Sequence, residues 1–189
     1  MAKNENDFSA LRQQIEKEDA ERDVVINKSR EVIKLTKTVI YAIHRNEIKK
    51  AETTKKALDK AFDEVRNVAS GNHHGAYRAA AQEYVEAVSY LYYIKNQKLI
   101  PESELRLDAE SYLLGICDLT GELGRRAVNS VIKEDYEEFR RIKDIIINIY
   151  EEMQLFDLRN SELRKKVDGI KYEVKKVEDI SLQLKLKGK

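Results

Sequence analysis

The scarcity of turn-forming residues constrains the fold of this chain more than any other feature. One proline, Pro101, and seven glycines are spread over 189 residues, which is too few for the many tight turns of a β-sheet protein. Apolar residues recur instead at steps of three and four along nearly the whole chain, which is the spacing of one face of an α-helix. The sequence therefore predicts an all-α protein.

The breaks in this spacing predict six or seven helices joined by short loops. A glycine at 71 is a usual helix stop, Pro101 suits a first helical turn, and Asp108 can cap the helix that follows it. The expected helices cover residues 7–45, 48–68, 75–96, 101–105, 109–131, 134–154 and 161–186. Because no repeat and no Ser-, Gly- or Pro-rich linker divides the chain, we expect residues 1–189 to form a single-domain helical bundle.

Charge and cysteine content exclude several classes of protein. Lys and Arg number 35 against 34 Asp and Glu, so the formal net charge of +1 excludes a bulk polycation but leaves a local basic patch possible. The single cysteine, Cys117, excludes an internal disulfide and a multi-cysteine zinc site. No apolar run approaches the roughly 18 residues of a membrane span. We expect a soluble cytoplasmic protein with no membrane partner.

An apolar seam of seven-residue period runs along the last predicted helix. Its positions are Leu163, Val167, Ile170, Val174, Val177, Ser181 and Leu184. Such a seam requires another helix against it. Because long helices in so short a chain carry more apolar surface than one bundle can cover, we expect the protein to form an oligomer.

A polar stripe interrupts the otherwise apolar helix 109–131. Asp118, Glu122, Arg125 and Asn129 follow one another at steps of four, three and four. Two like charges about 4 Å apart repel by about 4 kcal/mol at an effective dielectric constant of 20, so carboxylates on a buried helix need a cation. Arg125 could be that cation in a purely structural role; a divalent metal ion is the alternative. Oxygen ligands alone favour Mg²⁺ or Mn²⁺.

Two further features accompany this stripe. Glu83 and Glu86 share a face of the helix 75–96, a spacing that is on its own typical of a solvated surface. Gly115, Gly121 and Gly124 lie within the helix 109–131 although each costs roughly 1 kcal/mol relative to Ala, which indicates close approach of another helix or of a ligand.

Other catalytic and binding patterns are mostly missing. None of the three histidines follows a glutamate at i+3, so the ligands of a di-iron bundle are absent. The chain carries no recognisable nucleophile triad, phosphate-binding glycine loop or dinucleotide fingerprint. Arg30, Lys34 and Lys37 share one face of the first helix. Such a row is usually a solvated face, but it could also bind phosphates.

Several stretches together resemble the translin family over nearly the whole chain. They are Ser29-Arg30, Ile43-His44-Arg45, QEYVEAVS at 82–89, YLLG-x-x-DLTGEL at 112–123 with Asn129-Ser130-Val131, and LRKK-x-DG-x-KYEVKKVE at 163–178. The last stretch resembles the translin branch. The third and fourth stretches resemble the branch called translin-associated factor X. The combination of these two stretches with a translin-like last stretch in one chain resembles the archaeal type.

The resemblance implies an α-helical protomer that assembles into a closed, hollow, roughly octameric shell. Such a shell binds single-stranded RNA or DNA inside and cleaves RNA there with Mg²⁺. Carried over by position, the catalytic and metal-binding residues are Glu83, Glu86, Asp118 and Glu122. Because one chain combines these acids with a translin-like end, we expect a homo-oligomeric endoribonuclease.

The resemblance and the basic row together give the expected contacts to nucleic acid. These are Arg30, Lys37, His74, Arg78 and Arg125. Two other classes of function stay open. One is a single-stranded RNA- or DNA-binding protein in which the acids are structural, and the other is a purely architectural helical oligomer.

Overall fold

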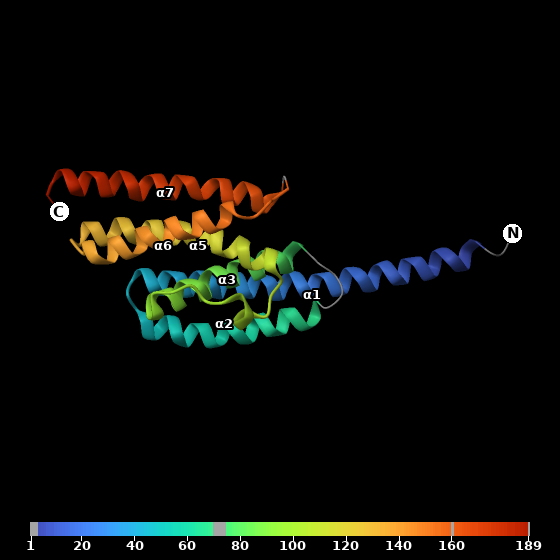
Figure 1. Cartoon of the computed structure of the whole chain (residues 1–189). Coiled ribbons are helices and arrows are strands. Elements are labelled where there is room, and N and C mark those ends of the chain that lie inside the picture. Colours follow the sequence, from blue (N-terminus) through green and yellow to red (C-terminus); the bar gives the residue numbers. More distant parts are fainter. Residues whose placement is uncertain (1–3, 70–74, 160, 189) are drawn as a thin grey trace.

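The computed structural model describes residues 4–69, 75–159 and 161–188. These residues form seven helices and no strand, which confirms the all-α prediction. The helices are α1 (Asn4–His44), α2 (Ile48–Val68), α3 (Gly75–Asn96), α4 (Glu102–Leu105), α5 (Ala109–Ile132), α6 (Tyr136–Gln154) and α7 (Glu162–Leu186). Figure 1 shows α3 between the α1–α2 pair on one side and α5, α6 and α7 on the other.

The observed helix ends lie close to those that the apolar spacing predicts. The Asp108 side chain caps α5 by accepting a hydrogen bond from the Ser111 backbone N–H, and Ser161 caps α7 in the same way. Pro101 differs from the prediction: its backbone is extended, so it precedes α4 as the N-cap and is not its first helical residue. The predicted stop at Gly71 lies outside the described residues.

The apolar core runs through all the long helices. Its largest fully buried side chains include Leu58, Phe62, Tyr90, Leu119, Leu123, Ile142, Ile146 and Ile170. The rings of Phe62 on α2 and Tyr84 on α3 stack with centroids 4.1 Å apart. α3 thus packs against α2 through this stack.

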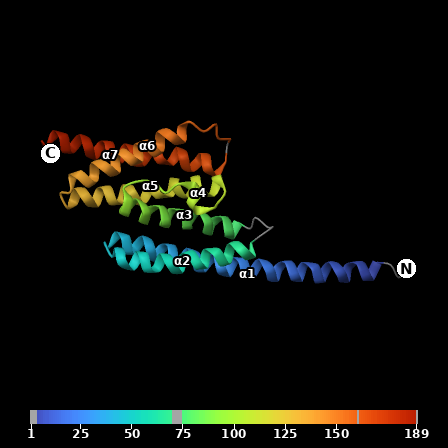
Figure 2. The same cartoon turned by 60° about the horizontal axis from the view of Figure 1, so that its bottom comes forward.

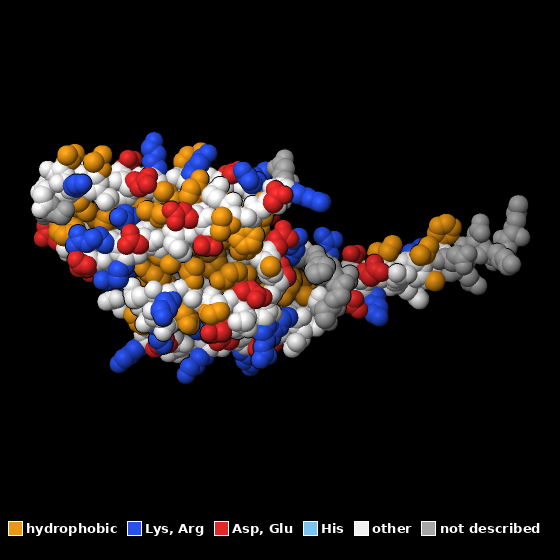
Figure 3. All heavy atoms as spheres, in the orientation of Figure 1, with side chains coloured by type: hydrophobic (Ala, Val, Ile, Leu, Met, Phe, Trp, Pro, Cys, Tyr) orange, Lys and Arg blue, Asp and Glu red, His pale blue; other side chains and the backbone are white. Residues whose placement is uncertain are grey.

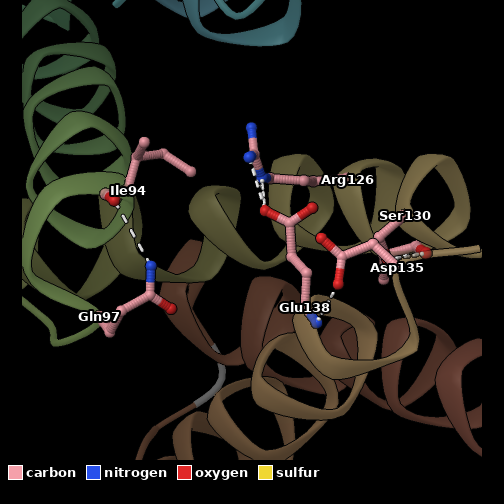
Figure 4. A network of polar contacts seen from close by, with 7 residues as sticks. Ile94, Gln97, Arg126, Ser130, Asp135 and Glu138 are labelled. Carbon is pink, nitrogen blue, oxygen red and sulfur yellow. Dashed lines mark hydrogen bonds and ion pairs between the residues drawn. The ribbon is translucent and has the colours of Figure 1, made fainter. Parts of the chain in front are cut away.

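The turn between α5 and α6 is fixed by a small polar network (Figure 4). The Asp135 carboxylate accepts a hydrogen bond from the Glu138 backbone N–H at 2.9 Å, and the Asp135 N–H donates to the Ser130 carbonyl at 2.9 Å. Glu138 also accepts a hydrogen bond from Arg126 Nε at 2.7 Å. This ion pair ties the start of α6 to the last turns of α5.

The apolar seam of α7 is covered within the chain. Leu163, Val167, Ile170 and Val177 are buried, and α7 lies along α5 and α6 (Figure 1). A second protomer is therefore not needed to cover this seam. The prediction that another helix packs against this seam is confirmed, and the partners are α5 and α6 of the same chain.

The first half of α1 extends well beyond the rest of the molecule. Figures 1 and 2 show it as an isolated helix that leaves the bundle at one end. Every residue from 8 to 24 is exposed, and Val25 is the first buried residue of the helix. Among the described residues, no helix is both long and apolar enough to cross a membrane.

Candidate active site

Glu83 and Glu86 on α3 and Asp118 and Glu122 on α5 are partly buried, and the two helices that carry them pack against each other. Burial, together with the negative charges of Asp118, Glu83 and Glu122, raises the pKa of Glu86 to about 8. These three carboxylates therefore lie near enough to Glu86 for their charges to oppose its ionisation. Considered alone, the Glu83–Glu86 spacing predicts a solvated face; the structure instead places this face of α3 against α5.

A glycine allows α3 and α5 to approach closely at this point. A Cβ atom on Gly115 would lie 2.5 Å from Val85 Cβ and 2.7 Å from the Gln82 carbonyl oxygen. Gly124 lies against the Glu173 side chain of α7, whereas a Cβ on the exposed Gly121 would meet nothing within 4 Å. The predicted close approach of another helix is thus confirmed for Gly115 and does not apply to Gly121.

Side chains from α1, α3 and α7 contact three of the four acids. Lys166 Nζ donates to Asp118 Oδ1 at 2.5 Å, and Gln82 Nε2 donates to Asp118 Oδ2. His44 Nε2 contacts Glu122 Oε2. Thr36 Oγ1 lies 3.4 Å from Glu83 Oε2, within hydrogen-bonding distance, and no described residue hydrogen-bonds to the Glu86 carboxyl group. Glu86 is therefore the least compensated of the four acids.

Arg125 is not the cation that the stripe on α5 predicts. Its side chain is exposed, and no described residue forms an ion pair with it. The stripe is partly buried at Asp118 and Glu122 and becomes exposed at Arg125 and Asn129. Lys166 forms an ion pair with Asp118 instead, and His44 contacts Glu122. Spacing within α5 could not reveal these partners, because Lys166 lies 48 residues after Asp118 and His44 lies 78 residues before Glu122.

The donor set fits an ion that prefers oxygen ligands. Four carboxylates, one of them with a strongly raised pKa, form a local excess of negative charge that a divalent cation such as Mg²⁺ would relieve. In the present side-chain arrangement, no three His, Cys, Asp or Glu residues of the described chain are grouped closely enough to hold a metal ion. Asp118 and Glu122 are engaged by Lys166, Gln82 and His44.

The described basic residues that are predicted to contact nucleic acid lie on three helices, α1, α3 and α5. Arg30 and Lys37 are exposed and lie on one face of α1. Arg78, at the start of α3, forms an ion pair of 2.8 Å with Glu110. His74 lies outside the described residues. The arrangement places exposed positive charge on α1, which also supplies the contact to Glu122.

The fold and the partly buried acids define a class of protein: an all-helical bundle with carboxylates on two central helices that pack against each other. The chain belongs to the Translin family, whose sequence model matches residues 20–188. Translin of Gallus gallus is 34% identical, covering 61% of this chain and 56% of the relative. The chain thus spans little more than half the length of that relative. Translin-associated protein X of Pongo abelii is 26% identical over 96% of this chain and 78% of its own length.

Solved structures share the same fold. The crystal structure of apo-NeC3PO matches with a TM-score of 0.85 and 26% identity, covering 95% of this chain and 96% of that one. The structure of AfC3PO in a complex with duplex RNA matches with a TM-score of 0.85 over the same shares of the two chains. At 23% identity, this second similarity shows the fold alone.

Proposed function

We propose that this protein is a Mg²⁺-dependent endoribonuclease that binds and cleaves single-stranded RNA inside a homo-oligomeric shell. The observation that carries the proposal is the meeting of Glu83, Glu86, Asp118 and Glu122 between α3 and α5, with the pKa of Glu86 raised to about 8. Perturbed carboxylates gathered at one place are typical of functional sites. AfC3PO, which shares the fold, is solved in a complex with duplex RNA, and by analogy we propose RNA as the ligand here.

Glu83, Glu86, Asp118 and Glu122 would hold the metal ion, either Mg²⁺ or Mn²⁺. When bound there, the ion supplies positive charge to the scissile phosphate and activates water for attack. Lys166 and Gln82 orient the Asp118 carboxylate, and His44 orients that of Glu122. Lys166 also places a positive charge beside the acids, and it would be free to contact a phosphate if a metal ion bound Asp118.

The basic row on α1 provides a path for the RNA backbone to this site. Arg30, Lys37 and His44 are spaced seven residues apart, about 10.5 Å of helix each, and share one face. His44 contacts Glu122, so the row ends at the acids. We propose that phosphates follow this row, with Arg78 and Arg125 as further contacts. His74, predicted from the sequence, belongs to the same proposal.

The proposed assembly is a homo-octamer of cytoplasmic location. Apolar side chains that remain exposed on α1 and near the end of α7, among them Phe8, Leu11, Ile15 and Leu186, support association of protomers. Enclosure of the site inside such an oligomer would keep the exposed basic row of α1 away from other polyanions and hold a single strand of RNA next to the acids.

A second candidate function is binding of single-stranded RNA or DNA without cleavage. The observation that favours it is the engagement of Asp118 and Glu122 by Lys166, Gln82 and His44. These contacts compensate two of the acids without a metal ion. In this alternative the cluster stabilises the bundle, and only the basic row functions.

An RNA cleavage assay with and without EDTA distinguishes the two functions. The purified protein is incubated with labelled single-stranded and duplex RNA in Mg²⁺, in Mn²⁺ and in excess EDTA. We expect cleavage of the single strand that EDTA abolishes and that Glu122→Gln reduces at least a hundredfold. The matched control, Glu151→Gln, changes an exposed acid of α6 and should cleave at the parental rate. Binding without cleavage in either metal would establish the second function instead.

A further inference from the structure

Two of the ten tyrosines, Tyr41 on α1 and Tyr172 on α7, lie exposed on the surface. Their exposed fractions are 57% and 66%, whereas the other tyrosines are buried or half-buried. An exposed ring adds little to the core. What such a ring can bind therefore depends on the charges around it and on its position relative to the acids.

The ring of Tyr41 has no partner in the described part of the chain. No described residue stacks on it, places a cation over it or hydrogen-bonds to its hydroxyl group, whereas Lys171 Nζ lies 5.1 Å from the centroid of the Tyr172 ring. Ile40 and Ile43, in the same turn of α1, are 7% and 0% exposed and hold this turn on the core. Tyr41 thus presents a free aromatic face from a fixed position.

All charged residues near Tyr41 along α1 are basic. Residues 32–46 contain no acid, and their Lys34, Lys37 and Arg45 are exposed and form no ion pair with any described residue. The projecting half of α1 differs, because acidic and basic side chains are mixed there (Figure 3). Lys37 and Arg45 lie four residues before and after Tyr41, so they are its neighbours on the same helix face. The ring therefore lies between two positive charges that are free to bind phosphates.

Tyr41 lies at the level of α1 where this helix contacts the acids. His44, three residues after Tyr41, contacts Glu122, and Thr36, five residues before it, lies 3.4 Å from Glu83. Along the helix axis, Tyr41 is therefore about 4.5 Å from His44 and about 7.5 Å from Thr36. A strand that follows the basic row to the acids passes this ring.

A free aromatic face between two unpaired cations fits an unpaired nucleobase on a sugar–phosphate strand. In sites for single strands, bases stack on aromatic side chains while positive charge follows the backbone. In a duplex the bases are paired and stacked on one another, so they do not reach such a ring. A ring at this position would thus favour a single strand over a duplex.

We propose that Tyr41 stacks on an unpaired base of the RNA strand whose phosphates follow the basic row on α1. The inference rests on the proposed binding of RNA at this row, and it names the feature of the strand that is recognised there. Because every base has an aromatic face, the contact selects single strands and tolerates different sequences.

Tryptophan fluorescence tests the stacking directly, because the chain contains no tryptophan. Tyr41→Trp introduces a single indole at this position and keeps an aromatic face. The assembled variant is titrated with a single-stranded RNA, with a duplex of the same length, and with an abasic strand that keeps the phosphates and lacks the bases. The titrations are made in EDTA, and in Mg²⁺ by stopped flow before cleavage. We expect the single strand to quench the emission strongly and the other two to leave it nearly unchanged.

The other exposed tyrosine provides the matched control. Tyr172→Trp makes the same change on α7, where Lys171 lies over the ring and Asp168 precedes it by one turn. Its emission should not respond to any of the three RNAs. A difference between the two variants therefore assigns the quenching to the position of Tyr41 on α1.

Binding affinities provide an independent measurement. Loss of one base–aromatic stack weakens binding about fivefold to a hundredfold, so Tyr41→Ala should weaken the binding of single-stranded RNA within this range and leave that of the duplex nearly unchanged. Tyr41→Phe removes only the hydroxyl group and should bind as the parent does. Fluorescence anisotropy measures the affinities, and far-ultraviolet circular dichroism controls for folding, since the side chain is exposed.

Three results would overturn the stacking, and they differ in what they leave in force. Equal quenching of Tyr41→Trp by the abasic strand would show that only phosphates lie near this position. Binding of the single strand without quenching, or with the parental affinity in Tyr41→Ala, would place the bases elsewhere and leave the proposed function standing. A parent protein that binds no RNA in either EDTA or Mg²⁺ would overturn the proposed function as well.

Discussion

Glu86 is the residue whose chemistry departs furthest from that of a surface acid. Its pKa rises from 4.5 to about 8 through burial and three neighbouring carboxylates. The folded protein therefore binds one more proton than the unfolded chain between these two pH values. Without metal, the stability should fall as the pH rises from 4.5 to 8.

The variant Glu86→Gln should remove this part of the pH dependence. At pH 9 in EDTA, we expect it to be more stable than the parent by up to about 5 kcal/mol, because one pKa unit corresponds to about 1.4 kcal/mol and the pKa rises from 4.5 to about 8. At pH 4 the two proteins should be nearly equal. Urea unfolding at several pH values measures the difference, with the exposed Glu137→Gln as control. Parallel stability curves for Glu86→Gln and the parent would contradict the raised pKa.

A second prediction at the residue scale concerns Lys166, which donates a hydrogen bond to Asp118 at 2.5 Å. Lys166→Met keeps the length of the side chain and removes the donor, which should cost about 1.5 to 3 kcal/mol in EDTA. If the acids bind Mg²⁺, the ion should restore the lost stability, so the Mg²⁺-induced rise in melting temperature should exceed that of the parent. Lys165→Met changes an exposed neighbour and serves as control. Equal Mg²⁺ responses of both variants and the parent would argue against a metal site at Asp118.

At the scale of elements, the packing of α3 on α5 depends on the absence of a side chain at Gly115. Gly115→Ala places a Cβ 2.5 Å from Val85 Cβ, which should destabilise the fold by about 1 to 3 kcal/mol in spite of the better helix propensity of Ala. Gly121→Ala on the same helix meets nothing within 4 Å and should stabilise the protein by about 1 kcal/mol. Thermal unfolding of both variants tests this opposition. Changes of the same sign would show that α3 and α5 are less closely packed.

The helices themselves could be predicted from the sequence, and their partners could not. Apolar spacing and the capping residue Asp108 locate helix ends because these signals act within a few residues. The partners of Asp118 and Glu122 are Lys166 and His44, which no periodicity within α5 indicates. Arg125 lies on the same face of α5 as Asp118 and Glu122, which suggested a local ion pair. This face is partly covered at Asp118 and Glu122 but is exposed at Arg125.

At the scale of the whole molecule, the same limit applies to association. The heptad pattern of α7 correctly indicates a helix partner, but a pattern cannot distinguish a partner in the same chain from one in another copy. The structure assigns α5 and α6 to this seam. The uncovered apolar surface lies instead on residues 8–24 of α1, where Phe8, Leu11 and Ile15 share one face and no part of the described chain reaches them. What covers a protruding helix can therefore be determined only when its neighbours in space are known.

The last prediction concerns the electrostatics of the whole molecule. With a net charge of only +1, the protein should bind RNA through local rows of positive charge, so single residues of the row on α1 should change the salt dependence measurably. For a single strand, the slope of log K against log salt concentration changes by about 0.7 per phosphate contact. Lys37→Ala and Arg30→Ala should each flatten the slope by about this amount and weaken binding equally for unrelated sequences. Lys133→Ala, an exposed change beyond the end of α5 and about 22 Å along that helix from Asp118, should leave the slope unaltered. Fluorescence anisotropy titrations between low and physiological salt, with the assembled protein, provide the measurement; equal slopes for Lys37→Ala, Arg30→Ala and Lys133→Ala would place the row on α1 outside the path of the RNA.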